Sequence, residues 1–479
     1  EDKAVEPLMI PSPGQVRVSV TDTKSGEPIV ARVTFIRTGD TPSAYAPQNA
    51  RPAQKTWSGD RSGVAYVTSA DEVVSLPAGT YQATASRGPT HERDQQEVTV
   101  IAGQEVSISM SIEQVIDTTG WLSGDFHIHA YWSPDSYVPW HIRARQAATE
   151  DLDLPILTEH VYIGSLQQAI EDAGVQGDTI GVAGQEVTTF THGHFNAFPL
   201  DWRTEEPNGG AVYPHDKGAV DLFQAIRDQH PGDEIIQVNH PRGSDISGYF
   251  SYVGLKANED TVGRPGDWST NWDAIEVFNG GCGKHDELQD WIGLTNHGYR
   301  KALASGSDSH GEDGLIGTPR NWIQVDMASV KADHEALVAP IRERRSFVSC
   351  GPFVRFTAVD SEGKTVAGLG DLTGVDAEGN ANFHVVVQAP TWITLDEVRL
   401  WENGQVIRVE DITTSADPVT RFDAVWTVTP TADAWYSIEV IGSGSMAPVT
   451  WSGPPYALTN PIEVDQDGDG QWKAPGAIE

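Results

Sequence analysis

The hydrophobic pattern changes character twice along the chain, and this change most constrains the fold. Residues 16–20, 30–35 and 105–110 alternate apolar and polar side chains, the period of a half-buried strand. From Trp121 to about Ser349, short apolar runs alternate instead with helical patterns. The strand period then returns. Because 479 residues are too many for one ordinary core, we expect three domains, at 1–115, 116–349 and 350–479.

The two outer regions are predicted to be β-sandwiches. In the first, Leu-Pro-Ala-Gly-Thr-Tyr at 76–81 turns the chain and starts the next strand. Its pattern resembles the carboxypeptidase-regulatory-like sandwich, which implies a structural or surface-contacting role. In the last region, Asn403 and Gly404 supply the positive φ of a type I′ hairpin turn.

The middle region is predicted to be α/β. Its apolar runs at 154–157, 234–238 and 274–278 are typical of buried parallel strands. Helical patterns separate them, at 142–150, 219–229, 288–303 and 330–345. This alternation predicts a parallel barrel or sheet with functional groups at the carboxyl ends of the strands. The fold class is therefore multidomain, α/β plus β.

The charge and the cysteines exclude several classes of protein. Against 32 Lys and Arg stand 68 Asp and Glu, a net charge of −36 that repels nucleic acid and anionic membranes. No apolar run approaches the ~20 residues of a membrane helix. Two cysteines, Cys282 and Cys350, cannot form a disulfide framework, and whether they pair stays open. A start at Glu1 without Met leads us to expect a removed export signal and a periplasmic or extracellular location.

The histidines gather in the middle region, where 12 of the 15 lie between His127 and His310. His127 and His129 point the same way on a strand, as two ligands of one metal would, although a solvated His-x-His face is a common alternative. His160, His240 and His310 end apolar runs, where a parallel strand would deliver them to the functional face. Imidazoles with carboxylates and no thiolate suit catalysis by Zn²⁺, Mn²⁺ or Fe²⁺.

The order of these residues resembles a known family. Ser-Gly-Asp-Phe-His-Ile-His at 123–129, Gly-His-Phe-Asn-Ala at 193–197, Asn-His-Pro-Arg at 239–242 and Ser-Asp-Ser-His at 307–310 carry the likeness. They resemble the PHP (polymerase and histidinol phosphatase) family of metal-dependent hydrolases, and more specifically its CehA/McbA-type branch. The resemblance covers about half of the chain. It implies a distorted (β/α)₇ barrel with two or three clustered divalent metal ions, Mn, Fe or Zn.

The resemblance also implies which residues hold each ion. His127, His129, Glu186 and Asp308 would bind the first metal. Glu186 would bridge to a second, completed by His194 and His240. Asp135, His160 and His310 would bind a third. Asp135 stands where some relatives have His, so the number of filled sites stays open.

This arrangement predicts hydrolysis by a metal-bound hydroxide, because a bridged pair of cations ~3.5–4 Å apart activates water without a Ser or Cys nucleophile. Asp308 or His310 would guide its proton. Arg242, two residues past His240, would bind the substrate anion, with an ion pair at the rim as the alternative. Asp125 and Glu159 are expected to orient imidazoles.

The leading function is hydrolysis of a small phosphoester or phosphodiester. The same chemistry would serve a carbamate or carboxylic ester, and a non-catalytic, metal-stabilised binding protein is a further alternative. A nucleic-acid substrate does not fit the charge. Oligomeric state cannot be predicted from these patterns.

A second, separate metal site is possible near the C-terminal end of the sequence. Asp465, Asp467 and Asp469 alternate as in a calcium-binding loop. However, the twelfth position of such a loop would be Gly476 rather than the bidentate Glu. A structural Ca²⁺ and a plain acidic turn both remain open.

Overall fold

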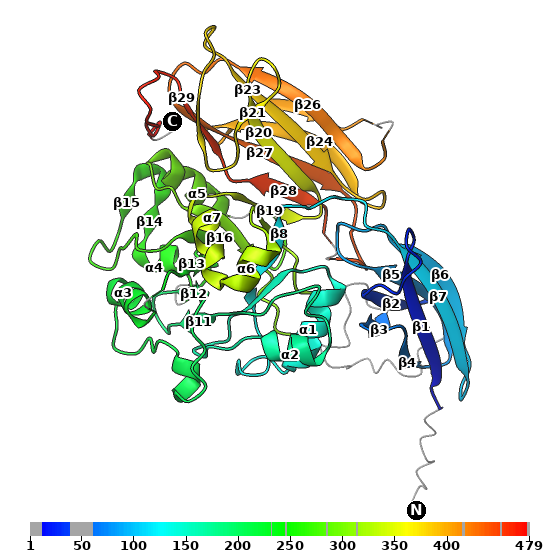
Figure 1. Ribbon diagram of the computed structural model, residues 1–479. Helices are drawn as coiled ribbons and strands as arrows, with labels where there is room; N and C mark the ends of the chain where they lie inside the picture. Colours follow the sequence, from blue (N-terminus) through cyan, green and yellow to red (C-terminus); the bar gives the residue numbers. More distant parts are fainter. Residues whose placement is uncertain are drawn as a thin grey trace, which may run out of the picture.

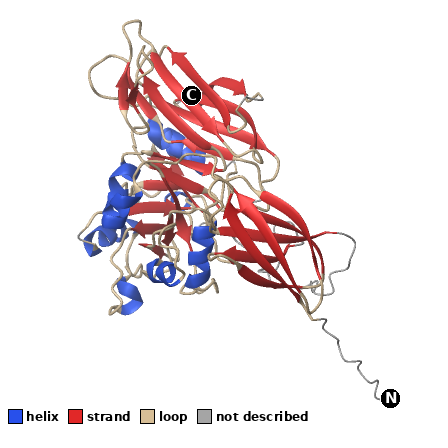
Figure 2. Cartoon of the chain, turned by 45° about the vertical axis from the view of Figure 1, so that its right-hand side comes forward, coloured by secondary structure: helices blue, strands red, loops and turns tan. Residues whose placement is uncertain are grey.

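The structure is a computed structural model that describes residues 12–38, 61–230, 232–244, 247–283, 286–312, 315–413, 417–450 and 453–476. Strands dominate it, and the few helices gather around the middle part of the chain (Figure 2). The multidomain, sheet-rich organisation expected from the sequence is confirmed. No helix among the described residues is long and apolar enough to cross a membrane.

The N-terminal strands form two facing sheets, at the right of Figure 1. The sheet orders are β4-β1-β7 and β3-β2-β5-β6. Val16, Val18 and Val20 on one sheet share a core with Val33 and Phe35 on the other, because alternate side chains of each strand point inward. Residues 1–11 and 39–60 of the predicted sandwich lie outside the described residues. The strands are β1 (Gly14–Asp22), β2 (Ala31–Thr38), β3 (Arg61–Val67), β4 (Glu72–Leu76), β5 (Gly79–Ser86), β6 (Asp94–Val100) and β7 (Glu105–Ile112).

The strands of the middle region belong to two different sheets. β10, β9, β8, β18 and β19 begin an 11-stranded sheet, whereas β11, β12, β13, β16 and β17 form a sheet of their own. The strands are β8 (Leu122–Ile128), β9 (Leu154–Leu157), β10 (Val182–Ala183), β11 (Gln185–Thr188), β12 (His194–Phe198), β13 (Ile235–Asn239), β14 (Leu255–Lys256), β15 (Thr261–Val262), β16 (Ala274–Asn279), β17 (Ala302–Gly306), β18 (Arg320–Ile323) and β19 (Ser346–Cys350).

The structure does not show the predicted closed (β/α)₇ barrel. Strand β12 runs antiparallel to both β11 and β13. The reason is local: residues 189–193 join β11 to β12 without a helix, and a parallel neighbour would need a longer crossover. The two sheets meet nonetheless at isolated bridges, between Ile128 and Ser309 and between His160 and Glu186.

The helices follow the predicted segments to different degrees. The pattern at 219–229 coincides with α3, whereas the pattern at 330–345 is broken into short pieces because the Asp333 side chain caps a new turn by accepting from the backbone N–H of Glu335. The helical elements are α1 (Trp140–Thr149), α2 (Gln167–Asp172), η2 (Pro207–Gly210), α3 (Ala219–Gln229), α4 (Tyr249–Val253), η3 (Ala257–Glu259), α5 (Asp286–Asn296), α6 (Met327–Ala332), η4 (His334–Leu337) and α7 (Val338–Arg342).

The C-terminal strands continue the sheet of the middle region, since β28 pairs antiparallel with β19. From there β27, β24 and β25 extend the 11-stranded sheet, while β21-β20-β23-β26 forms a separate one. Asn403 and Gly404 have positive φ angles of 52° and 84° in the β24–β25 hairpin, as expected of the turn. The strands are β20 (Phe353–Val359), β21 (Thr365–Ala367), β22 (Leu372–Gly374), β23 (Ala381–Gln388), β24 (Thr394–Glu402), β25 (Gln405–Asp411), β26 (Thr420–Val428), β27 (Ala434–Ser443), β28 (Tyr456–Thr459) and β29 (Ile462–Asp465).

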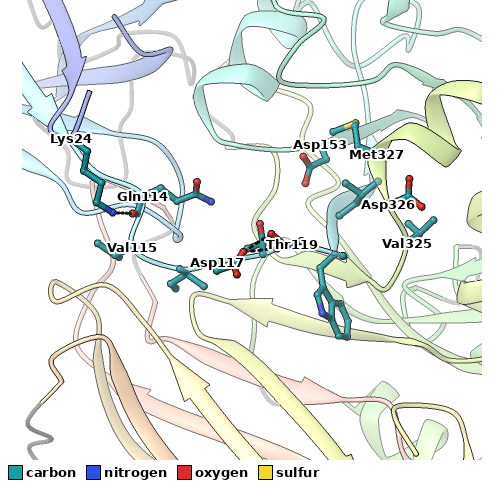
Figure 3. Close-up of a pocket in the computed structure, with 14 residues that line it drawn as sticks. Lys24, Gln114, Val115, Asp117, Thr119, Asp153, Val325, Asp326 and Met327 are labelled. Carbon is teal, nitrogen blue, oxygen red and sulfur yellow. Dashed lines mark hydrogen bonds between the residues drawn. The ribbon is translucent and has the colours of Figure 1, made fainter. Parts of the chain in front are cut away.

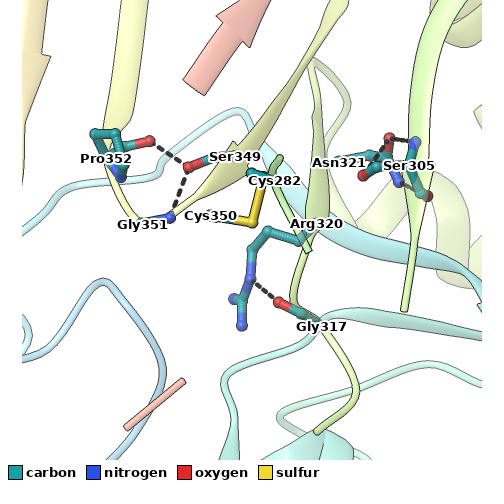
Figure 4. Close-up of a disulfide and its surroundings, with 9 residues drawn as sticks. All are labelled: Cys282, Ser305, Gly317, Arg320, Asn321, Ser349, Cys350, Gly351 and Pro352. Carbon is teal, nitrogen blue, oxygen red and sulfur yellow. Dashed lines mark hydrogen bonds between the residues drawn. A yellow bond between two sulfur atoms is a disulfide. The ribbon is translucent and has the colours of Figure 1, made fainter. Parts of the chain in front are cut away.

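A disulfide settles the question left open for the two cysteines. Cys282, in the loop after β16, is bonded to Cys350 at the end of β19, with 6.0 Å between their Cα atoms (Figure 4). The bond therefore connects the loop after β16, a strand of the smaller sheet, with the end of β19, a strand of the 11-stranded sheet.

Candidate metal centre

All of the predicted metal ligands lie together where the two sheets of the middle region meet. Each is delivered by the carboxyl end of a strand, by the loop after it, or by β11 and β12. His127, His129 and Glu186 have fully buried side chains. The ligands are His127 in β8, His129 and Asp135 after it, His160 after β9, Glu186 in β11, His194 in β12, His240 after β13, and Asp308 and His310 after β17.

Glu186 stands at the middle of this cluster and faces five imidazoles. Because it is buried among them, its carboxylate is positioned to serve as a metal ligand together with these imidazoles. Oε1 lies 3.3 Å from His127 Nε2, 3.3 Å from His194 Nδ1 and 3.6 Å from His240 Nε2, and Oε2 lies 2.6 Å from His160 Nδ1 and 3.8 Å from His129 Nε2.

Two further carboxylates complete the cluster. Asp308 Oδ1 lies 3.3 Å from His127 Nε2 and 3.2 Å from His129 Nε2. Asp135 Oδ2 lies 3.3 Å from Nε2 of both His160 and His310. The Asp135 side chain is 55% exposed, against 30% for His310 and less for the others. The cluster therefore opens to solvent on its Asp135 side.

Three of the imidazoles present an unsatisfied nitrogen to the centre. The Nδ1 atoms of His127, His129 and His310 lie 2.8–2.9 Å from Glu276 Oε1, Ser133 Oγ and the Asp308 carbonyl respectively. Donation from each Nδ1 leaves a lone pair on Nε2. Within the described residues, these three buried Nε2 atoms have no hydrogen-bond partner.

A buried polar atom without a partner costs about 1–3 kcal/mol, so three in one place require an explanation. Metal ligation would supply one, because a neutral imidazole can bind a metal through its Nε2 lone pair. Three groups have ligand atoms within 4.8 Å of one another: His127, His129 and Asp308; His127, Glu186 and His240; and His129, His160 and His310. The residues present therefore fit a metal-binding site.

The electrostatics act differently on the individual ligands. Burial lowers the pKa of His127, but the charges of Asp308, Glu276 and Glu186 outweigh it and raise that pKa well above the ordinary value. Burial lowers the pKa of His129 to about 3, so its imidazole is neutral. Burial raises the pKa of Glu186, but the charge of His127 and hydrogen bonds from neighbouring imidazoles outweigh it and hold the pKa well below the ordinary value. Glu186 is therefore a carboxylate at neutral pH.

A carboxylate absent from the sequence-based prediction holds two of the ligands. Glu276 is 1% exposed in β16; its Oε1 accepts from His127 Nδ1 at 2.8 Å and its Oε2 from the His240 backbone N–H at 2.7 Å. Asn279 donates both to Glu276 Oε2 and to Asp308 Oδ2, each at 3.1 Å. A single carboxylate inside the apolar run Ala-Ile-Glu-Val-Phe at 274–278 was the available signal.

The two carboxylates predicted to orient imidazoles act less directly. Glu159 accepts from the Ser133 hydroxyl, which in turn accepts from His129 Nδ1. Asp125 instead accepts from backbone N–H groups, including those of Ser307 at 3.0 Å and Gly317 at 2.7 Å. Asp125 therefore fixes the loops around the centre and makes no hydrogen bond to an imidazole of a predicted ligand among the described residues.

Arg242 is engaged away from the centre. Its guanidinium donates to both oxygens of Asp290, at 2.7 and 2.6 Å, and to the Leu255 carbonyl at 2.7 Å. This bidentate pairing favours the alternative role for Arg242, which is an ion pair at the rim, over the binding of a substrate anion.

The acidic C-terminal loop is organised differently from the prediction. Asp465 accepts from the backbone N–H groups of Gly468 and Gly470, both at 2.7 Å. Asp433, Asp465 and Asp467 are close enough to hold an ion. Asp469 is not part of that group. Lys473 Nζ lies 2.7 Å from Asp469 and also contacts Asp467.

A cavity of about 540 Å³ lies away from the metal centre, beneath the connection from the N-terminal sandwich to β8 (Figure 3). Asp117, Asp153 and Asp326 line it, and Lys24 lies at its other side. None of the predicted metal ligands contributes to its described lining.

Comparisons with known proteins do not assign this chain to a family. No protein-family model matches the sequence, and no curated protein matches it. An engineered protein solved at 1.98 Å aligns with 11% identity over 40% of this chain and 48% of its own, with a TM-score of 0.15. This chain thus spans about half the length of that structure.

An FMN-binding β-glucuronidase from Facaelibacterium prausnitzii L2-6 aligns with 10% identity, over 98% of this chain and 75% of its own, with a TM-score of 0.18. Both scores are too low to carry an argument about fold or function. The PHP resemblance therefore stays a prediction from the motifs.

Proposed function

We propose that this protein is a hydrolase that uses two or three divalent metal ions, Mn, Fe or Zn, to cleave a small phosphoester or phosphodiester. The observation that carries the proposal is a set of three buried Nε2 atoms without a hydrogen-bond partner among the described residues. Two of them lie beside Glu186 and Asp308 and the third beside Asp135. Bound divalent cations would lower the pKa of water and stabilise the charge of a phosphoryl transition state.

The side chains of the centre would have different roles according to their solvent exposure. His127, His129 and Glu186 are buried and hold the centre rigid. Asp308 and His310 are 24% and 30% exposed, with Asp308 Oδ1 3.6 Å from His310 Nδ1. These two groups are positioned to carry a proton between the reacting atoms and solvent. A direct role for Arg242 toward the substrate would first require release of Asp290.

Membership of the PHP family, in its CehA/McbA-type branch, is part of this proposal. It rests on the order of the motifs from His127 to His310, and it does not depend on a closed barrel. The proposal also includes export to the periplasm or cell exterior, which the Cys282–Cys350 disulfide supports because such bonds persist in oxidising compartments.

The test is elemental analysis of the purified protein together with turnover of bis(p-nitrophenyl) phosphate, p-nitrophenyl phosphate and an aryl carbamate. We expect Mn, Fe or Zn to be present and turnover of the phosphodiester or phosphomonoester to stop on chelation. Preference for the carbamate would move the proposal to carbamate and ester hydrolysis. Absence of tightly held metal and of all turnover after metal supplementation would refute it and leave a binding protein.

A further inference from the structure

Several exposed aromatic side chains lie in loops close in sequence to the predicted metal ligands. Among the described residues, the exposed large aromatics are Tyr131, Trp132, Tyr137, Phe190 and Tyr213, between 45% and 75% exposed. The first three share the loop after His129 with Asp135, the most exposed ligand. Phe190 lies between Glu186 and His194. Solvent-exposed aromatic rings beside a catalytic centre indicate a surface that another molecule covers.

Ring contacts and hydrogen bonds join these side chains into one structure. Trp132 stacks on Tyr162, with centroids 4.8 Å apart and planes 1° from parallel. Phe190 stacks on His215 at 6.0 Å, and His215 contacts Tyr213 at 6.1 Å. We name Tyr131, Trp132, Tyr162, Tyr213, His215 and Phe190 the aromatic arc.

A polar bridge separates the two stacked pairs of the arc. Asn208 Nδ2 donates to the Val161 carbonyl at 3.0 Å, beside Tyr162, and to the Tyr213 hydroxyl at 2.9 Å. The arc therefore consists of two flat platforms with amide and hydroxyl groups between them. Such alternation suits an extended ligand with successive rings rather than a single compact one.

The surroundings of the arc exclude two kinds of ligand. A small aryl group prefers an enclosed apolar pocket. The cavity of about 290 Å³ at the Phe190 end instead combines apolar groups with many polar ones, including Thr189, Asp216 and Lys217. Single-stranded nucleic acid also stacks on aromatic rings, but it requires a basic groove. Here Lys217 is bound to the Tyr213 carbonyl, and the net charge is −36.

We propose that the aromatic arc binds a neutral oligosaccharide chain. Sugar rings present apolar C–H faces that stack on aromatic platforms, and hydroxyl groups that bond to side chains such as Asn208. The inference deepens the proposed function and rests on it in one point only. The bond cleaved at the metal centre would be an ester attached to the sugar. Binding to the arc itself requires no metal.

The experiment measures binding of cellohexaose, xylohexaose, mannohexaose and chitohexaose by calorimetry to the full chain, metal-loaded and chelator-treated. We expect at least one of them to bind in both states. Trp132→Ala and Phe190→Ala should each weaken that binding about tenfold, the order of effect of one lost stacking contact. Both side chains are largely exposed, at 53% and 75%, so the variants should fold. Val425→Ala, 55% exposed on β26, is the control and should bind normally.

Three results would overturn the inference: no binding to any of the four sugars, binding that neither arc variant weakens, or tighter binding to a poly-dT oligonucleotide. Its failure can be distinguished from failure of the proposed function. Sugar binding without hydrolysis would support oligosaccharide binding by the aromatic arc and refute the proposed hydrolase. Hydrolysis of aryl phosphoesters without sugar binding would support the hydrolase and refute oligosaccharide binding.

Discussion

The metal centre and the acidic C-terminal loop are both rich in metal-ligand residues, yet they differ in how those groups are satisfied. At the centre, the Nε2 atoms of His127, His129 and His310 have no hydrogen-bond partner among the described residues. In the loop, both oxygens of Asp465 accept backbone N–H groups, and Lys473 already places a cation beside Asp467 and Asp469.

The difference separates a cluster with buried ligand atoms that lack hydrogen-bond partners from a loop whose carboxylates already have partners. Spacing in the sequence could not distinguish the two, because both have chelating residues at alternate positions. What distinguishes them is the remaining hydrogen-bonding capacity of buried groups. Four substitutions test this explanation.

The largest effect is expected from Glu186→Gln. Removing the central charge should release about one metal equivalent or more, because the amide cannot bridge two cations, and should reduce turnover to background. Elemental analysis and phosphoesterase assays would measure both. Asp465→Asn is the matched control in the loop and should keep full metal content and activity. Full metal and activity in the Glu186 variant would contradict the assignment of the centre.

Glu276→Gln should have the next largest effect. The amide cannot accept from both His127 Nδ1 and the His240 N–H, so metal affinity should fall by about 10–100-fold, as for other groups that orient ligands. Competition with a chelator of known affinity measures this independently of turnover. Glu259→Gln, at a side chain that is 61% exposed, provides the control. Unchanged metal affinity would show that Glu276 does not orient the ligands.

Within the acidic loop, Asp465→Asn should lower the free energy of unfolding by about 1 kcal/mol, since one backbone N–H loses its charged acceptor. Calcium should not change the melting temperature of the Glu186→Gln variant, in which the loop is intact. Thermal unfolding with and without CaCl₂ measures both effects. A rise in melting temperature that saturates with calcium would instead establish an ion site at Asp433, Asp465 and Asp467.

Asp153 is a third case, a carboxylate outside both groups whose Oδ2 accepts from the backbone N–H and the hydroxyl of Ser123, at 2.7 and 2.9 Å. Burial and the neighbouring charge of Asp151 raise its pKa to about 7, above its ordinary value of 3.8. The folded protein therefore holds a proton that the unfolded chain releases, so this group lowers stability as the pH rises from about 4 to 7. Asp153→Asn should raise the melting temperature at pH 8 by a few degrees, on the order of 1 kcal/mol, and much less at pH 4. An equal shift at both pH values would refute this explanation.

Local patterns predicted the local elements well. The period-two segment at 16–20 lies in β1, and the helical pattern at 219–229 is α3. The ligands converge because most of them end strands or follow them, a property visible in the sequence. Pairing direction was not visible in this way: hydrophobic period does not distinguish a parallel neighbour from an antiparallel one, and β12 is antiparallel.

Hydrogen bonds between side chains far apart in the sequence could not be predicted either. Glu276 and His127 are hydrogen-bonded although 149 positions separate them in the sequence, and Asp290 and Arg242 although 48 positions do. No spacing rule connects such pairs, because the fold alone brings them together. The sequence could therefore identify candidate ligands but not the groups that orient or occupy them.

The 11-stranded sheet has a consequence for how this protein could evolve. Strand β19 pairs with β28, and the Asn460 side chain accepts from the backbone N–H of Leu303 in β17. The C-terminal strands are thus not an accessory that recombination could exchange at residue 349. A fusion protein joined at that point would lack β28 and expose the unpaired edge of β19, which favours aggregation. The middle region and the C-terminal strands are expected to be inherited as one unit.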